Sequence, residues 1–287
     1  MHFVDAKSIL SAKNGMNIYR GCTHGCIYCD SRSDCYNMRH DFEDVEVKRN
    51  APELLEKALA SKRRLCMIGT GAMSDPYMHC EEKLRLTRRC LEVIDRHGFG
   101  VTVLTKSDMI LRDADLLCSI NSKAKAVVQM TLTTYDEDLC RIIEPNVCTT
   151  KRRYEVLEAM QKNGIPTVVW FTPVLPFIND TEENLRGILS YCFDAGAKGI
   201  ICMGIGTTLR DGDREYFYSA LDRYFPGMKQ RYISQYGNEY ICNSVNNGRL
   251  MSIFCNECEK HGVMYEPAKV FSYLYEFPEK NEQLSFF

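Results

Sequence analysis

The sequence predicts an α/β protein built from parallel βα units. Short apolar segments alternate with longer amphipathic segments along most of the chain, and this alternation is typical of strands joined by crossover helices. Glycines stand where several amphipathic segments end, as they commonly do at helix C-termini. A chain of 287 residues is long enough for one barrel-type domain of roughly 200 to 250 residues with extensions. We therefore expect one main domain followed by a smaller C-terminal region.

The predicted elements follow one another in a regular order. Six segments have the length and apolar character of buried strands: 16–19, 65–69, 101–105, 126–132, 167–172 and 199–203. Five segments between them have helical character: 52–61, 81–97, 108–119, 151–163 and 181–194. Pro52 suits the first turn of its helix, and Gly98 and Gly164 each follow the last residue of one.

A short loop after the first predicted strand carries three cysteines, in the sequence RGCTHGCIYCD. Cys22, Cys26 and Cys29 have the spacing C-x3-C-x2-C. Cysteine thiolates, usually four, hold iron–sulfur clusters, so a loop with three of them leaves one iron of a cubane without a protein ligand. Chemistry takes place at such an open position. Gly21 and Gly25 would let the backbone turn tightly around an inorganic core, and we predict a 4Fe–4S cluster here.

Two other interpretations of this loop are less well matched by its spacing. A structural zinc site typically has four ligands arranged as two separated pairs, although His24 could serve as the fourth ligand. An electron-transfer iron–sulfur protein would supply four cysteines to its cluster, and the loop motif itself contains three. The three-cysteine cluster is therefore the interpretation that we prefer.

The composition indicates in which compartment the protein is found and which classes of partner it is expected to bind. The 36 basic and 38 acidic side chains give a net charge of -2, so the sequence has no strong nucleic-acid or membrane-surface signal. No apolar run approaches the roughly 18 residues of a membrane span, and the N-terminus lacks a signal-peptide profile. The 15 cysteines, an odd number, fit a reducing compartment better than a disulfide framework. We expect a soluble, cytoplasmic protein.

The cysteine loop, with Tyr28 just before its last cysteine, resembles the signature of radical S-adenosylmethionine (SAM) enzymes. Later motifs resemble the spore photoproduct lyase-like group of these enzymes: GTGAMSDPY, LTKSD, QMTLTTYDEDL, IIEP, KRRYEVLEAM and GIPTVVWFTPVLPFIND. The resemblance implies a partial (β/α)6 TIM-type barrel over about residues 14–230, with a C-terminal cap over 231–287. It also implies an active site at the C-terminal ends of the strands, where the cysteine loop falls.

The resemblance further implies which residues contact SAM, whose amino and carboxylate groups chelate the open iron in this family. We expect the backbone of Tyr28 to meet the adenine. Ser74 and Asp75, in the loop after the second strand, are expected beside the amino or ribose groups. Lys106, at the end of the third strand, is expected to pair with the carboxylate as a compact point charge.

Three further contacts come from the fourth strand and the helix after it. Thr131 and Thr133 alternate with Leu132, so both are expected on one strand face with hydroxyls toward the ribose. Arg153 is a second candidate partner for the SAM carboxylate. Each residue also has an ordinary interpretation, since threonines are common strand formers and an arginine is usually a solvated charge.

The activity implied by the resemblance is reductive cleavage of SAM. An electron donor such as flavodoxin or ferredoxin reduces the cluster, SAM breaks into methionine and a 5'-deoxyadenosyl radical, and the radical removes a hydrogen atom from the substrate. One departure concerns this substrate: where spore photoproduct lyases place a hydrogen-donating cysteine, this sequence has Ala72 or Met73. DNA repair is therefore disfavoured.

A small nucleoside or nucleotide substrate suits a chain without a basic stripe. We hypothesise a radical SAM lyase that releases queuine from queuosine or its 5'-phosphate, a role in queuosine salvage that rests on analogy within the group. A radical SAM peptide or amino-acid modifying enzyme and a nucleic-acid lesion lyase remain the alternatives.

The region from 231 onward adds further candidates. A helix is predicted over 250–260, and Cys255 and Cys258 on it, with Cys242, are candidate ligands of a second metal centre or ordinary core residues. Three tyrosines offer aromatic faces that could stack on a base, although at least two are expected to be packing residues: Tyr232, Tyr236 and Tyr240. The tail over 278–287 is expected to be an ordered strap or a frayed end.

Overall fold

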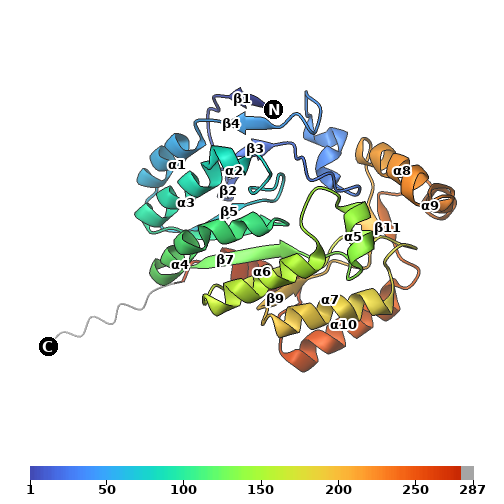
Figure 1. Cartoon of the computed structure of the whole chain (residues 1–287). Helices are drawn as coiled ribbons and strands as arrows, with labels where there is room; N and C mark the ends of the chain where they lie inside the picture. Colours follow the sequence, from blue (N-terminus) through green and yellow to red (C-terminus); the bar gives the residue numbers. More distant parts are fainter. Residues whose placement is uncertain (279–287) are drawn as a thin grey trace.

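A six-stranded parallel sheet forms the centre of the protein (Figure 1). The structure is a computed structural model that describes residues 1–278. The strand order is β2-β5-β6-β7-β8-β9, with every neighbouring pair parallel. The strands are β2 (Gly15–Met16), β5 (Met67–Thr70), β6 (Gly100–Thr105), β7 (Ala126–Thr131), β8 (Thr167–Trp170) and β9 (Gly199–Ile201). All six correspond to predicted segments, and the predicted partial (β/α)6 barrel is confirmed.

Helices connect successive strands and cover one side of the sheet. They are α1 (Ala51–Ala60), α2 (Glu81–Leu84), α3 (Leu86–His97), α4 (Ala114–Lys123), α5 (Glu137–Ile143), α6 (Thr150–Lys162) and α7 (Glu182–Asp194). The helix predicted over 81–97 is divided in two because Arg85 adopts a left-handed conformation with φ 52°. The helix predicted from Asp108 begins instead as a 3-10 turn, η3 (Asp108–Asp113), before α4.

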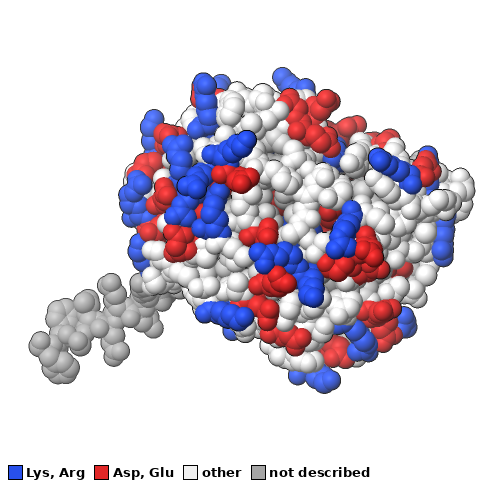
Figure 2. All heavy atoms as spheres, in the orientation of Figure 1, with Lys and Arg blue, Asp and Glu red and all other residues white. Residues whose placement is uncertain are grey.

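Charged side chains of both signs are interspersed on the face shown in Figure 2. Several form ion pairs between α1 and α3, including Arg89 with Glu53 and Arg96 with Glu56, each at 2.6 Å. Exposed pairs of this kind contribute only about 0 to 1 kcal/mol each, so the helices are held mainly by their apolar faces.

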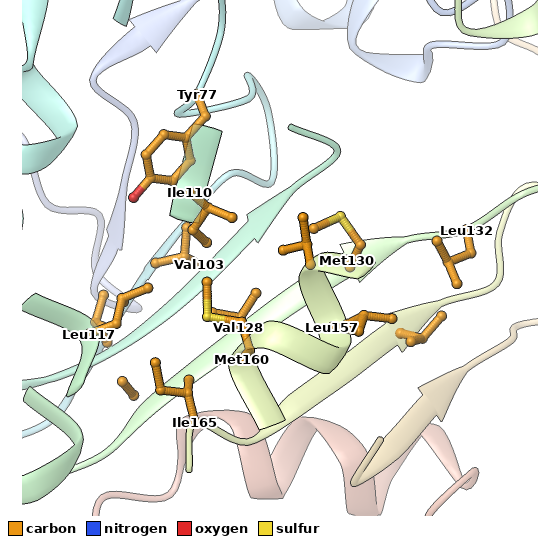
Figure 3. Packing of buried hydrophobic residues seen from close by; sticks show 14 of the residues in the cluster. Tyr77, Val103, Ile110, Leu117, Val128, Met130, Leu132, Leu157, Met160 and Ile165 are labelled. Carbon is orange, nitrogen blue, oxygen red and sulfur yellow. The ribbon is translucent and has the colours of Figure 1, made fainter. Parts of the chain in front are cut away.

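Alternation along each strand separates an outer apolar layer from the barrel interior. Val128 and Met130 of β7 pack with Val103 and the helix residues Leu157 and Met160, as Figure 3 shows. The intervening residues of β7 point the other way, and there Val127 packs with residues of a C-terminal helix. Helices therefore cover the outside of the sheet, while the other face of the strands lines the barrel interior.

A separate three-stranded sheet precedes the barrel. Its strands are β1 (His2–Val4), β4 (Glu46–Lys48) and β3 (Tyr19–Arg20), in the order β1-β4-β3. The strand predicted over 16–19 is therefore wrong as one element, because Met16 ends β2 and Tyr19 begins β3. The cysteine loop continues from β3 and is followed by the 3-10 turns η1 (Asp30–Arg32) and η2 (Asp34–Tyr36).

The C-terminal elements lie at both ends of the barrel. They are β10 (Gly206–Thr208), α8 (Asp213–Tyr224), α9 (Met228–Tyr236), β11 (Ile241–Asn243), α10 (Asn247–His261) and α11 (Pro267–Tyr275), with β10 and β11 paired antiparallel. Helix α10 packs beside α7, and α11 contacts β5 and β9. Val270 and Leu274 of α11 pack against Val127 and Val168 in the barrel interior. Helix α11 thus fills the end of the barrel opposite to the carboxyl ends of the strands.

Two predictions concern this region. The division of the chain at residue 230 falls inside α9, and it stays a prediction. The tail predicted as a strap or frayed end over 278–287 lies, apart from its first residue, outside the described residues. Within residues 1–278, none of the helices has the length and apolar character needed to cross a membrane.

Candidate cofactor and substrate site

A cavity of about 440 Å³ opens at the carboxyl ends of the parallel strands. Its wall comes from the cysteine loop, the strand ends and the β10–β11 pair. The lining residues are Tyr28, Cys29, Asp30, Ala72, Leu104, Lys106, Thr131, Trp170, Thr172, Pro173, Met203, Gly204, Gly206, Thr207, Thr208, Tyr240, Ile241 and Asn243. This is the end of a parallel barrel where the fold places active sites.

Hydrogen bonds inside the barrel fix the orientation of Trp170 in this wall. The Trp170 Nε1 donates to Gln129 Oε1 at 2.7 Å, and the Gln129 Nε2 donates to Thr102 Oγ1 at 2.7 Å. Three neighbouring strands, β6, β7 and β8, are joined by this chain of contacts. The indole ring therefore presents a fixed aromatic surface to the cavity.

The cysteine loop is anchored at both ends and requires glycine where it turns. The backbone N–H of Cys22 donates to the Phe42 carbonyl at 3.0 Å, and that of Ile27 donates to the Ile143 carbonyl at 3.0 Å. Gly21 has φ +89°, and a Cβ at this position would lie 2.4 Å from the Phe42 oxygen. Any side chain at Gly21 would push the loop away from its anchor, so the sequence RGC is needed for this geometry.

The chemistry of the three thiols fits an iron–sulfur cluster. Cys22 and Cys26 are buried, whereas Cys29 is partly exposed and lines the cavity. Burial, with Asp75 nearby, raises the pKa of Cys22 to about 12, and burial also raises the pKa of Cys26, although Lys106 opposes this. Buried thiols of this kind become thiolates when a metal replaces the proton. The loop thus offers three soft ligands, with Cys29 facing the cavity.

Lys106 lines the cavity beside the cysteine loop. Its side chain makes no salt bridge with a carboxylate within residues 1–278, and its Nζ lies 5.8 Å from the centroid of the Tyr28 ring. Its pKa is raised: burial alone would lower it, but the Cys26 thiol and the Glu144 carboxylate outweigh that effect. A partly buried ammonium without a salt-bridge partner within residues 1–278 is suited to hold an anionic group of a ligand.

Asp75, in the loop after β5, is held by several protein partners. Its carboxylate accepts hydrogen bonds from Thr105 Oγ1 at 2.7 Å and from the backbone N–H groups of Lys106 at 2.8 Å and Tyr77 at 2.9 Å. It also lies 3.5 Å from His24 Nδ1. These partners occupy the carboxylate, so Asp75 joins the β5 and β6 loops to the cysteine loop. Asp75 and the buried Ser74 are both absent from the cavity lining, and their placement beside SAM stays a prediction.

Arg153 also has several protein partners, and its contact with the SAM carboxylate stays a prediction. Its guanidinium is fully buried, pairs with Glu144 Oε2 at 2.6 Å and donates to the carbonyls of Cys148 at 2.8 Å and Thr131 at 3.1 Å. Glu144 in turn accepts a hydrogen bond from the Tyr28 hydroxyl. Burial would raise the pKa of Glu144, but Arg153 and Lys106 outweigh it, and the pKa is lowered. Arg153 therefore supports Tyr28 from behind the cavity wall.

The two predicted strand threonines separate because β7 ends at Thr131. Thr131 lines the cavity, whereas Thr133 lies beyond the strand end and outside the lining. The Thr133 carbonyl accepts from Asn179 Nδ2 at 2.9 Å and Asn184 Nδ2 at 3.1 Å, and its buried hydroxyl has no partner among the described residues. The alternation on which the Thr133 prediction depended does not extend that far.

Of the three C-terminal tyrosines, Tyr240 lines the cavity. Tyr232 and Tyr236 are buried, and their hydroxyls donate to the carbonyls of Pro176 at 2.9 Å and Asn243 at 2.7 Å, as expected for packing residues. Cys242 is buried in the same apolar cluster, whereas Cys258 lies in the main core. This separation argues against Cys242 joining Cys255 and Cys258 around a second metal centre.

Much of the cavity wall was missed from the sequence. Met203 ends a predicted strand and Trp170 lies near the end of another, so their positions could have been inferred from the rule that barrel sites collect strand ends. Thr207, Thr208 and Asn243 come from the β10–β11 pair, for which the sequence has no clear signal.

The fold and the site define a radical SAM enzyme. The model of the radical SAM superfamily matches residues 16–192, more than half of the chain, and the chain belongs to this superfamily. The protein accordingly uses a 4Fe–4S cluster and SAM, and the thiols of the cysteine loop are suited to the cluster.

Related sequences come from distant organisms. The uncharacterized protein Mb2609c of Mycobacterium bovis is 30% identical over 229 residues, which are 77% of this chain and 66% of the relative. The uncharacterized protein MJ0683 of Methanocaldococcus jannaschii is 32% identical over 181 residues, which are 62% of this chain and 67% of the relative. The chain thus spans just under two thirds of the length of the mycobacterial relative.

Solved structures support the same fold. Spore photoproduct lyase complexed with dinucleoside spore photoproduct superposes with a TM-score of 0.63 at 12% identity, over 86% of this chain and 74% of that one. A C140S mutant of the same enzyme superposes with a TM-score of 0.62 over 92% of this chain and 78% of that one, also at 12% identity. At this identity the likeness concerns the fold alone.

Proposed function

We propose that the protein is a radical SAM lyase that acts on a small nucleoside or nucleotide and releases a modified base, with queuine from queuosine or its 5'-phosphate as the specific reaction. The observation that carries this proposal is the aromatic wall of the cavity. Tyr28, Trp170 and Tyr240 contribute rings around a space of about 440 Å³, on which a planar base could stack. Thr208 and Asn243 add polar groups for the edges of a base or a sugar.

The chain's own residues divide the tasks of such a site. Cys22, Cys26 and Cys29 would hold the cluster, and Lys106 would hold the SAM carboxylate through its ammonium group. When bound, the cluster would supply the electron for reductive cleavage of SAM, and SAM would supply the group that removes a hydrogen atom from the substrate. Trp170 and Tyr240 would position the target carbon–hydrogen bond and exclude water from it.

A small substrate agrees better with the molecule than a nucleic-acid duplex does. The net charge is -2, and lysine and arginine side chains are interspersed with acidic ones on the face shown in Figure 2. A duplex-binding enzyme usually carries a basic surface for phosphates. In addition, Ala72 lines the cavity in the loop where spore photoproduct lyases are expected to have a hydrogen-donating cysteine. A methyl group cannot take over that role.

The test uses anaerobically reconstituted protein with a chemical reductant, SAM and queuosine 5'-phosphate. Chromatography and mass spectrometry then follow 5'-deoxyadenosine and free queuine. The proposal predicts both products, with queuine absent when SAM is omitted. Formation of 5'-deoxyadenosine without queuine would exclude this substrate and leave the superfamily assignment intact. Turnover of a lesion-containing dinucleotide or of a peptide under the same conditions would instead favour a lesion lyase or a peptide-modifying enzyme.

A further inference from the structure

A second group of potential metal ligands lies in the N-terminal sheet, away from the residues that line the cavity. One ligand atom from each of His2, His40 and Glu46 lies within 4.8 Å of the other two. His2 on β1 and Glu46 on β4 are direct partners in the parallel ladder, and side chains of such partners share one sheet face. His40 approaches from the segment that precedes β4. The chain therefore gathers three candidate ligands for a divalent cation from two strands and a loop.

Hydrogen bonds hold both imidazole rings through the same nitrogen. The Nδ1 atom of His2 lies 3.0 Å from Asp44 Oδ2, and that of His40 lies 3.0 Å from the Asp41 carbonyl. Metal-binding histidines almost always use one ring nitrogen in this way, donating to a carboxylate or a backbone carbonyl, which leaves the other nitrogen for the metal. The two rings meet edge to face with centroids 4.9 Å apart.

The remaining ligand atoms lack protein partners. The Nε2 atom of His40 is buried and has no hydrogen-bond partner among the described residues. The Glu46 carboxylate makes no ion pair within residues 1–278, although Arg20 is its ladder partner on the other side. The Arg20 guanidinium instead donates to the carbonyls of Tyr36 at 2.7 Å and Asn37 at 3.0 Å. A buried imidazole nitrogen without a partner is costly, and a bound cation would satisfy it.

We propose that His2, His40 and Glu46 bind a zinc ion. Two imidazole nitrogens and one carboxylate oxygen form a ligand set that zinc accepts readily, and the fourth tetrahedral position would be left to water. Water can reach the site because the His2 side chain is 38% exposed. The carboxylate of Asp44 and the carbonyl of Asp41 orient the two rings from the outer shell.

The location suggests a structural role for this ion. The segment between His40 and Asp44 includes Phe42, whose carbonyl accepts the hydrogen bond from the backbone N–H of Cys22. A zinc ion joining His40 to β1 and β4 would fasten this segment against the N-terminal sheet. It would thereby support the point at which the cysteine loop begins, without taking part in the chemistry of the cavity.

The test measures zinc and iron separately in the full-length, untagged protein with its iron–sulfur cluster reconstituted anaerobically. After chelation, addition of zinc and desalting, the parent should retain about one zinc ion per chain. The variants H40A and E46Q should lose most of this zinc while keeping the iron content of the parent. H97A is the matched control, because His97 Nε2 also faces a glutamate, Glu56, at 2.6 Å but has no second histidine there.

X-ray absorption at the zinc edge identifies the ligands, because the cluster iron does not contribute to that edge. The proposal predicts nitrogen and oxygen scatterers at about 2.0 to 2.1 Å and no sulfur at about 2.3 Å. Sulfur scatterers would show that zinc occupies cysteine thiols and would overturn the proposal. Equal zinc retention by the parent, H40A and E46Q would overturn it as well, as would a parent that retains no zinc.

Discussion

The Arg153 guanidinium and the Glu144 carboxylate form an ion pair of 2.6 Å in which neither side chain has exposed surface. Glu144 follows the last residue of α5, and Arg153 lies on α6, so the pair joins two helices behind the cavity. The same carboxylate accepts a hydrogen bond from the Tyr28 hydroxyl. A charge pair thus connects the core to a residue of the cysteine loop.

Removal of one charge from this pair should destabilise the protein strongly. In Glu144→Gln the Arg153 charge remains buried without an anion, and breaking a buried pair from one side typically costs about 3 to 5 kcal/mol. We expect the free energy of unfolding to fall by that amount, as measured by urea denaturation. The double variant E144Q/R153M should recover part of the lost unfolding free energy, because it also removes the unpaired buried charge of Arg153.

A surface pair provides the comparison. Asp138 and Arg141 form an exposed pair at 2.7 Å, and D138N should cost less than about 1 kcal/mol. If E144Q and D138N had the same effect, the buried pair would not have the structural importance that we assign to it.

Asp213 should make stability depend on pH near neutrality. Burial, with Asp30 nearby, raises the pKa of Asp213 to about 7, from 3.8 for an unperturbed carboxyl. The folded state therefore binds a proton more tightly than the unfolded state, and this contribution to stability is lost as the pH rises from about 4 to about 7. In Asp213→Asn the unfolding free energy should fall less between pH 5 and pH 8 than in the parent.

The local contacts of Asp213 explain why asparagine is a suitable replacement. One oxygen accepts from the Arg210 backbone N–H at 2.5 Å, and an amide oxygen can keep this bond. The other oxygen is buried without a partner among the described residues, so the substitution breaks no hydrogen bond there. Identical pH profiles for the parent and D213N, measured by urea denaturation, would argue against a raised pKa.

Lys106→Met should weaken SAM binding. The variant removes the partly buried ammonium beside the cysteine loop. A hydrogen bond to a charged group contributes about 1.5 to 3 kcal/mol, which corresponds to about 10- to 150-fold in affinity. Equilibrium dialysis of reconstituted protein with labelled SAM measures the effect, and iron content shows whether the cluster is intact. Lys125→Met is the control, because Lys125 donates to the carbonyls of Tyr273 and Glu276, both on the C-terminal part of the chain. Equal SAM affinity in the two variants would place the SAM carboxylate elsewhere.

Alanine at Cys22, Cys26 or Cys29 should abolish cluster assembly. The parent is expected to hold about four irons per chain, and each variant close to none, as measured by anaerobic iron and sulfide analysis. Cys148 provides a demanding control, since its Sγ lies 3.1 Å from the Lys106 carbonyl and is therefore near the same site. C148A should keep its iron, and so should C255A/C258A. A parent with about eight irons per chain, reduced to about four in C255A/C258A, would instead support a second iron–sulfur cluster at Cys255 and Cys258.

Local sequence features predicted the strands and the cysteine loop well. Apolar runs such as 126–132 and the glycines of RGCTHGC act through neighbouring residues, so they can be interpreted without the fold. The roles of Asp75 and Arg153 depend on partners that the topology supplies. Thr105 lies 30 residues from Asp75, and Tyr28 lies 116 residues from Glu144. No pattern in the sequence pairs such distant residues.

Two errors of element prediction arose because a local pattern does not show where a helix is interrupted or where a strand is very short. Amphipathic periodicity continues across Arg85, so the left-handed residue that divides α2 from α3 leaves no trace in the pattern. Strands β3 and β10 have two and three residues, too few for alternation to be recognised. The cavity wall contributed by Thr207 and Thr208 was missed for this reason.

The last prediction concerns substrate recognition by Tyr240. This side chain is 43% exposed at the cavity wall, and the Arg210 guanidinium both donates to its hydroxyl at 2.6 Å and lies 4.6 Å from the ring centroid. If a base stacks on this ring, Tyr240→Ala should raise KM for the nucleotide about 5- to 100-fold, since stacking contributes about 1 to 3 kcal/mol per base. Tyr240→Phe keeps the aromatic face and should retain most of the affinity.

The background cleavage of SAM without substrate separates this effect from damage to the cofactor site, and it should be the same in Y240A and the parent. Tyr224→Ala is the matched control, because Tyr224 is 40% exposed and has the Arg223 guanidinium 5.0 Å from its ring centroid but does not line the cavity. KM should be unchanged in Y224A. An unchanged KM in Y240A would mean that the substrate does not stack on this wall, and a loss of SAM cleavage in the same variant would assign Tyr240 to the cofactor instead.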